Sequence, residues 1–332
     1  MKRFAKWILV RVFRKVPRQR LKVESMNLIL CSFLLLFGLT TTASAWDDFG
    51  HMTIGAIAYD HLTPKVRKNV DALLRLNPSY REWVGGITAQ DKGKVAFMKA
   101  ATWPDMIKID MRYTDDGNRP KGPDAARNIG YADMLMHRYW HFIDIPFSFD
   151  GTDLVEPDIP NAQTQIRAFR ETLRDSGASD ELRSYDLVWL LHLVGDVHQP
   201  LHATSRFNRK QPNGDSGGND VRVCDRAGDC RGKLHRFWDE LLGTSEDYRT
   251  AMAKAKTLAP GEPKLAVILD EAVWIEESVL AAKQTAYAAP IGSDEGPYNL
   301  NDTYRAVALQ VAERRIALAG IRLAHLLNEV LN

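Results

Sequence analysis

The chain has 332 residues, of which 45% are hydrophobic and 26% are charged, so it has the composition of a globular protein and enough length for a large core. This composition excludes a disordered or a collagen-like chain. The formal net charge is +2 at pH 7.

The first 45 residues have the three-part order of a secretory signal peptide. The basic stretch MKRFAKWILVRVFRKVPRQR is followed by the apolar run LILCSFLLLFGL and by small residues that end in Ala43-Ser44-Ala45. The apolar run is about a dozen residues long, too short to cross roughly 30 Å of hydrocarbon as a helix. We therefore expect cleavage before Trp46, no stable membrane anchor, and a secreted or periplasmic protein. Met26 is an alternative start, although it would leave a signal without a basic side chain.

Cleavage would reverse the sign of the net charge. Residues 1–45 hold nine basic residues and one acid, so residues 46–332 carry 35 basic and 41 acidic residues and a net charge of −6. An acidic protein is a poor candidate for a broad basic groove along a phosphate backbone. If the protein handles phosphates, bound cations must supply the positive field.

The apolar spacing after Trp46 is mostly helical. It runs through TIGAIAYDHL after His51, through residues 162–175, and through TYRAVALQVAERRIALAGIRLAHLLNEVL at the C-terminus. Strand signal is nearly confined to VRVC and its partner. No repeat or domain linker interrupts the pattern, so residues 46–332 are expected to form one mostly α domain with a small β-hairpin.

Two cysteines flank the short segment DRAGD. In an exported protein, Cys224 and Cys230 would form a disulfide that closes the hairpin, whereas in a reducing compartment they would be two free thiols.

A further helix is predicted to begin after Ser179, which is followed by Asp180 and Glu181, and to end near Pro200. It contains the segment HLVGDVHQPLH, in which His192 and Asp196 are four residues apart and therefore share a helix face. His202 lies just past the proline and could reach the same region.

Burying these polar side chains among leucine, valine and tryptophan would cost several kcal/mol without a partner. A metal ion would supply that partner, whereas the alternative for His192 and Asp196 is a simple hydrogen-bonded pair. The recurrence of the pattern favours a metal. LHRFWDELLG repeats the spacing with His235 and Asp239, and we expect that helix to end near Gly243.

Further candidate ligands lie upstream. WHFID supplies His141 and Asp144, and TWPD supplies Asp105. Cleavage before Trp46 would leave a free α-amine, a nitrogen ligand when a metal displaces its proton, with His51 five residues on.

In this order the motifs resemble the zinc-dependent single-strand nucleases of the S-one/P-one type. The resemblance covers nearly all of residues 46–332 and rests on six blocks: W-x4-H, TWPD, HFID, H-x3-D-x5-H, GGN and H-x3-D. It implies a single helical domain of the type shared by zinc-dependent phospholipases C and single-strand nucleases, with three zinc ions. It also implies cleavage of single-stranded DNA and RNA to 5′-phosphate products, and leaves open the cleavage of 3′-mononucleotides.

The resemblance assigns roles residue by residue. The implied ligands of the first zinc are Asp105, His141, His192 and Asp196; those of the second are Trp46, His51 and the bridging Asp196; those of the third are His202, His235 and Asp239. The implied substrate residues are Phe142, which would stack on a base, Asp144, near the attacking water, and Asn219, near the phosphate. Lys108, the last implied substrate residue, differs from the family pattern, which often has an arginine at this position. A lysine can meet a phosphate as a point charge, but it cannot form the two parallel hydrogen bonds of an arginine.

Two other functions share some of these features. A zinc-dependent phospholipase C has a longer gap between the tryptophan and the first histidine and Glu as the last ligand, whereas this chain has a short gap and Asp239. A non-catalytic zinc protein would close its sites with four protein ligands, whereas the third site has three. The histidines His61, His137, His198 and His325 are predicted to be structural or surface residues. A monomer is expected, although the sequence does not fix the oligomeric state.

Overall fold

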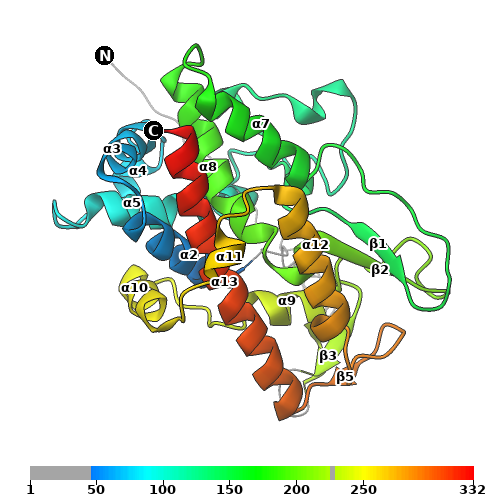
Figure 1. Ribbon diagram of the computed structural model, residues 1–332. Helices are drawn as coiled ribbons and strands as arrows, with labels where there is room; N and C mark the ends of the chain where they lie inside the picture. The colour runs from blue at the N-terminus through cyan, green and yellow to red at the C-terminus, as the bar shows by residue number, and fades with distance from the viewer. Residues whose placement is uncertain (1–45, 225–228) are drawn as a thin grey trace, which may run out of the picture. The chain divides into compact units, whose positions relative to one another are not determined.

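The computed structural model describes residues 46–224 and 229–332, and within them helices predominate, which confirms the mostly α prediction (Figure 1). The predicted signal peptide, residues 1–45, lies outside the described residues. The α-helices are α2 (Asp48–Asp60), α3 (Pro64–Leu74), α4 (Tyr80–Trp83), α5 (Lys92–Ala100), α6 (Trp103–Met106), α7 (Ala162–Arg174), α8 (Asp180–Asp196), α9 (Leu234–Asp239), α10 (Tyr248–Thr257), α11 (Pro263–Ala266), α12 (Glu271–Ala281) and α13 (Asp302–Val330).

Helix α8 is the central element. Ser179 caps it by accepting a hydrogen bond from the Leu182 amide at 3.2 Å, as the sequence predicts, and acidic residues follow in the first turn, near the positive end of the helix dipole. Every residue from Ser184 to Asp196 is buried. A helix that is apolar on all sides must be covered on all sides, and α2, α3, α7 and α13 pack around it.

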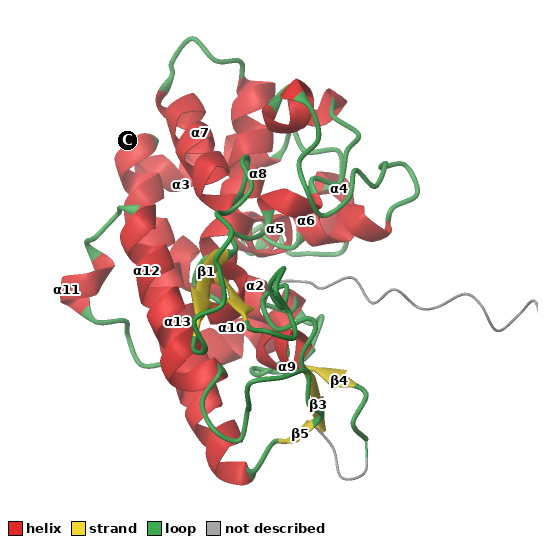
Figure 2. Cartoon of the chain, turned by 90° about the vertical axis from the view of Figure 1, so that its right-hand side faces the viewer, coloured by secondary structure: helices red, strands yellow, loops and turns green. Residues whose placement is uncertain are grey.

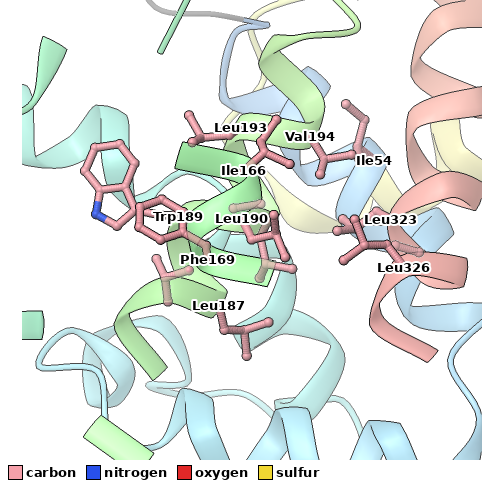
Figure 3. Close-up of a cluster of buried hydrophobic side chains, with 14 of the residues drawn as sticks. Ile54, Ile166, Phe169, Leu187, Trp189, Leu190, Leu193, Val194, Leu323 and Leu326 are labelled. Atoms are coloured by element: carbon pink, nitrogen blue, oxygen red, sulfur yellow. The ribbon is translucent and has the colours of Figure 1, made fainter. Parts of the chain in front are cut away.

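The core around α8 is shown in Figure 3. Leu190 and Val194 of α8 lie near Ile54 of α2 and Leu323 of α13, and all four side chains are fully buried. Each buried aliphatic side chain of this kind contributes about 1.5–3 kcal/mol to stability. Tight packing of this kind holds the ligand-bearing end of α8 in place.

Helix α13 lies close against α2 because of a glycine. A Cβ built on Gly320 would lie 2.7 Å from Cβ of Ile57, so no other residue fits without displacing one helix. The close approach fixes α2, which carries one of the candidate ligands.

The strands form two small sheets, β1–β2 and β4–β3–β5 (Figure 2). The predicted hairpin is confirmed: β3 (Arg222–Cys224) pairs antiparallel with β4 (Gly232–Lys233), and β5 (Tyr298–Asn299) adds in parallel to β3. A disulfide joins Cys224 and Cys230, and residues 225–228 between them lie outside the described residues.

The parallel pair of β1 (Ile145–Ser148) and β2 (Thr204–Phe207) was not predicted. Each strand has four residues and β1 contains a proline, so neither has a strong local strand pattern. The helix that carries His235 is also shorter than predicted, because α9 ends at Asp239 and not near Gly243. Within the described residues, no helix has the length and apolarity needed to span a membrane.

Candidate metal centre

Eight candidate metal ligands that are far apart in the sequence lie together in the structure. They are carried by α2, α6, α8 and α9, by the 3-10 helix η6 (Pro200–Ala203), and by the residue after the 3-10 helix η5 (Arg138–Trp140). Their ligand atoms form three groups, each within 4.8 Å: first, Asp105, His141 and His192; second, His51, His192 and Asp196; and third, His202, His235 and Asp239. All eight side chains are buried.

The first group gathers at the C-terminal end of α8, where His192 and Asp196 project from one helix face as their spacing predicts. His192 Nε2 lies 2.9 Å from His141 Nδ1 and 3.6 Å from Asp105 Oδ1. Asp196 Oδ2 lies 3.2 Å from both ring nitrogens. Four potential donor atoms therefore surround one small volume.

His51 lies on the other side of Asp196. Its Nε2 is 3.2 Å from Asp196 Oδ1, and its ring stacks on that of His192 with the centroids 4.0 Å apart. Neither ring nitrogen of His51 has a hydrogen-bond partner, although the ring is fully buried. The two oxygens of Asp196 thus face different histidines, which is the arrangement that a bridging carboxylate requires.

Trp46, at the start of the described chain, is tied to α9 by its neighbour, and its ligation of a metal together with His51 stays a prediction. The Asp47 amide donates a hydrogen bond to the Asp239 carbonyl at 3.1 Å, and the Trp46 side chain is fully buried. The start of the described chain is therefore held beside the third group.

The third group adjoins the first. His202 Nε2 and His235 Nε2 are 2.9 Å apart, and the Asp239 oxygens lie 3.9 and 3.7 Å from them. His202 Nδ1 donates to the His141 carbonyl at 2.9 Å, which ties the two groups together. Gln199 donates to Asp239 Oδ1 at 2.7 Å and so orients this carboxylate. Sequence reasoning missed Gln199, whose only signal is its place inside H-x3-D-x5-H.

The donor atoms fit divalent metal ions. In a tetrahedral zinc site with bonds near 2.1 Å, neighbouring ligand atoms are about 3.4 Å apart. The ligand-atom distances given above, from 2.9 to 3.9 Å, bracket this value. Two of the outer nitrogens also have suitable partners, because Nδ1 of His192 donates to the Ala101 carbonyl at 2.7 Å and Nδ1 of His235 donates to the Gly217 carbonyl at 2.7 Å. A histidine held in this way presents its other nitrogen to a metal.

The protonation states of three of these histidines also suit metal binding. Burial lowers the pKa of His141 to about 3, that of His235 to about 3 and that of His202 to about 4. These rings are therefore neutral at neutral pH, which is the form that ligates a metal. Burial raises the pKa of Asp239 well above its usual range, so this carboxyl group ionises readily only beside a cation.

Lys108 is buried beside the first group. Its Nζ lies 2.6 Å from Asp105 Oδ1. Burial alone would raise the pKa of Asp105, but the Lys108 charge and the nearby histidines lower it below its usual value. The ammonium thus contacts a candidate ligand, and contact with a phosphate stays a prediction.

The candidate substrate residues are more exposed than the ligands. Phe142 and Asp144 are half-buried, and burial raises the pKa of Asp144 to about 6, with the Asp215 charge adding to the shift. Asn219 is half-buried and donates to the Ser216 carbonyl at 2.9 Å. Their contacts with a substrate stay predictions.

The remaining histidines have protein partners. His198 Nδ1 donates to the Val194 carbonyl at 2.7 Å while its Nε2 accepts from Arg322 at 3.0 Å, so both nitrogens are used. His137 lies between Asp116 and Asp133, which raise its pKa against the effect of burial. His61 and His325 bond backbone carbonyls. These contacts agree with structural roles.

Comparison with known proteins gives a consistent result. The model of the S1/P1 Nuclease family matches residues 46–332. Endonuclease 3 of Arabidopsis thaliana is 26% identical over 324 residues, covering 92% of this chain and 96% of the relative. Endonuclease 4 of Arabidopsis thaliana is 27% identical, covering 90% and 93%. Nuclease S1 of Aspergillus oryzae is 25% identical over 305 residues, covering 84% and 89%. The chain therefore belongs to the S1/P1 nuclease family.

Proposed function

We propose that this nuclease is a zinc-dependent endonuclease that hydrolyses phosphodiester bonds in single-stranded DNA and RNA and leaves 5′-phosphate products. The observation that carries the proposal is the set of three adjoining His/Asp groups. Two of them meet at Asp196, because Oδ1 of this residue faces His51 while Oδ2 faces His141 and His192. Cleavage of 3′-mononucleotides is a second activity to test.

Three zinc ions are the proposed cofactors. Asp105, His141, His192 and Asp196 would hold the first; Trp46 through its amine and carbonyl, His51 and Asp196 the second; and His202, His235 and Asp239 the third. His192 Nε2 has one lone pair, so it would serve the first ion alone although it lies close to both groups. Imidazole and carboxylate donors at this spacing suit zinc.

The chain's own residues would divide the work of hydrolysis. Bound zinc ions supply the positive field that activates water and neutralises phosphoryl charge. Asp144, with a pKa raised to about 6, would orient the attacking water or accept its proton near neutral pH. Phe142 would stack on an unpaired base, and Asn219 and Lys108 would contact the phosphate.

The proposal includes the processing of the chain. Removal of residues 1–45 as a signal peptide would free the Trp46 amine, leave residues 46–332 as the catalytic domain, and direct the protein to the periplasm or the exterior. A monomer is sufficient for the site, because every proposed ligand comes from one chain.

Two measurements on protein beginning at Trp46 test the proposal. Elemental analysis by mass spectrometry should count three zinc ions per chain. Digestion of single-stranded DNA, single-stranded RNA, duplex DNA and phosphatidylcholine vesicles should show cleavage of the single strands with 5′-phosphate ends. Hydrolysis of the lipid in place of the nucleic acids would instead identify a phospholipase C.

A further inference from the structure

We propose that Asp215 is a positioning residue for the third metal group. It would hold the loop 215–219 so that a carbonyl of this loop fixes the ring of His235. The inference rests on the proposed function for its zinc ion, but the orientation of His235 can be tested without metal.

Asp215 is fully buried and its carboxylate gathers donors from three parts of the chain. Oδ1 accepts from the Arg206 amide at 2.9 Å, the Gly218 amide at 3.2 Å and the Tyr287 hydroxyl at 3.0 Å. Arg206 belongs to β2, and Tyr287 follows the π-helix Ala282–Ala286 (η7). The carboxylate thus ties the loop to two elements outside it.

The loop needs such an anchor because its backbone is in a conformation that side chains disfavour. Ser216, Gly217 and Gly218 have φ values of 53°, 59° and 80°, three left-handed residues in succession. A Cβ on Gly217 would lie 2.3 Å from the Leu201 carbonyl oxygen and 3.3 Å from His235 Nδ1. The loop is therefore wedged between η6 and α9, the two elements that carry the third group.

This position lets the loop orient His235. The Gly217 carbonyl accepts from His235 Nδ1 at 2.7 Å, and the Gly218 carbonyl accepts from the His235 backbone amide at 3.3 Å. The first bond fixes the tautomer and leaves Nε2 free to face His202. Asp215 therefore acts on His235 indirectly, through the backbone of residues 217 and 218.

An ion pair with Arg206 does not by itself explain the buried carboxylate of Asp215. Arg206 Nε lies 3.3 Å from Asp215 Oδ2, but the guanidinium also donates to the carbonyls of Gly292 and Asp294. The Oδ1 contacts go instead to two backbone amides and a hydroxyl. A carboxylate with these partners organises backbone as much as it neutralises a cation.

The test compares Asp215→Asn with Asp220→Asn, the same chemical change five residues on. In Asp215→Asn, the amide must turn its NH2 toward either the Oδ1 donors or Arg206 Nε, so a donor faces a donor in both orientations. Asp220 is exposed and its side chain accepts a hydrogen bond from Ser216 Oγ at 3.0 Å. Only the first variant should disturb the loop.

Two readouts are expected to change in Asp215→Asn and not in Asp220→Asn. Competition with a chelator should show one zinc ion bound about 10–100-fold more weakly, with the other two unchanged. In metal-free protein, ¹⁵N NMR of the imidazole rings should show His235 leaving its Nδ1–H tautomer. If Asp215→Asn does not fold, Tyr287→Phe removes one of the Oδ1 donors and should change both readouts in the same direction by less.

The possible failures are distinguishable. Unchanged zinc affinity together with an unchanged His235 tautomer would overturn the positioning role of Asp215. If His235→Ala keeps the full zinc content of the parent protein, the third zinc of the proposed function is wrong. The tautomer in metal-free protein then decides the positioning role alone.

Discussion

Replacing Asp196 with asparagine tests the bridging assignment most directly. In the structure Asp196 Oδ1 faces His51 Nε2 at 3.2 Å, and Oδ2 faces the ring nitrogens of His141 and His192, each also at 3.2 Å. An amide must point its NH2 at one of these two sides, and NH2 cannot ligate a cation. Its remaining oxygen carries less charge, so both sites should weaken.

The magnitude follows from the number of sites affected. A loss of about 100-fold in affinity at one site corresponds to about 2.8 kcal/mol of linked stability when the parent site is saturated. Two sites would lose about 5–6 kcal/mol, which at about 2–4 °C per kcal/mol lowers Tm by about 10–20 °C. The Asp196→Asn protein should therefore retain less than two zinc equivalents after dialysis.

Asp239→Asn is the matched control. Among the candidate ligand side chains, Asp239 lies near His202 and His235. This variant should therefore lose one zinc equivalent, and its Tm should fall by about half as much as that of Asp196→Asn. Zinc content by mass spectrometry and Tm by calorimetry are measured on both variants side by side. If each variant loses the same single equivalent, Asp196 does not bridge, and the pairing of two zinc ions in the proposed function is wrong.

Three further predictions concern the substrate and the processed end. Protein beginning at Trp46 should bind more zinc and react faster than protein with an extra N-terminal Met or Gly, because an acylated nitrogen is a poor ligand; equal zinc and equal rates would contradict this. Phe142→Ala should lower kcat/KM for single-stranded DNA by the factor that corresponds to losing one stacked base, about 1–3 kcal/mol, while zinc content is unchanged. Equal cleavage of duplex and single-stranded DNA by the parent protein would count against stacking. Arg119 lowers the pKa of Asp144, so Arg119→Ala should raise that pKa above about 6 and move the acidic limb of the pH–rate profile to higher pH. Arg119 is exposed, so a shift that persists in high salt would not be electrostatic.

The local part of the site could be predicted from the sequence because helical geometry converts spacing into position. His192 and Asp196 are four residues apart, a cap at Ser179 marks the start of their helix, and the structure places their ligand atoms 3.2 Å apart. The same rule applies to His235 and Asp239 on α9, although that helix proved shorter than expected.

Contacts between distant segments could not be predicted in this way. The β1–β2 pair joins segments about 60 residues apart, and the hydrogen bond from Gln199 to Asp239 spans 40 residues. Both contacts depend on how η6 packs after α8 ends. Neither the two short strands nor Gln199 belongs to a periodic sequence pattern that would predict these contacts. The family's ordered motifs, rather than spacing, linked Asp105 and His141 to α8.

Lys108 keeps a positive charge at a position where the resemblance implies an arginine. Its ammonium lies against Asp105, where it helps to keep a buried carboxylate ionised despite the cost of burial. A zinc ion bound by Asp105 would take over that task, because it supplies the cationic partner at the same carboxylate. The lysine would then be available to a phosphate, as a point charge on a flexible stem and without the fixed fork of an arginine. In the proposed function, metal binding and phosphate contact at Lys108 would be coupled through Asp105. Residues 46–332, with a net charge of −6, would need both cations to hold an anionic substrate.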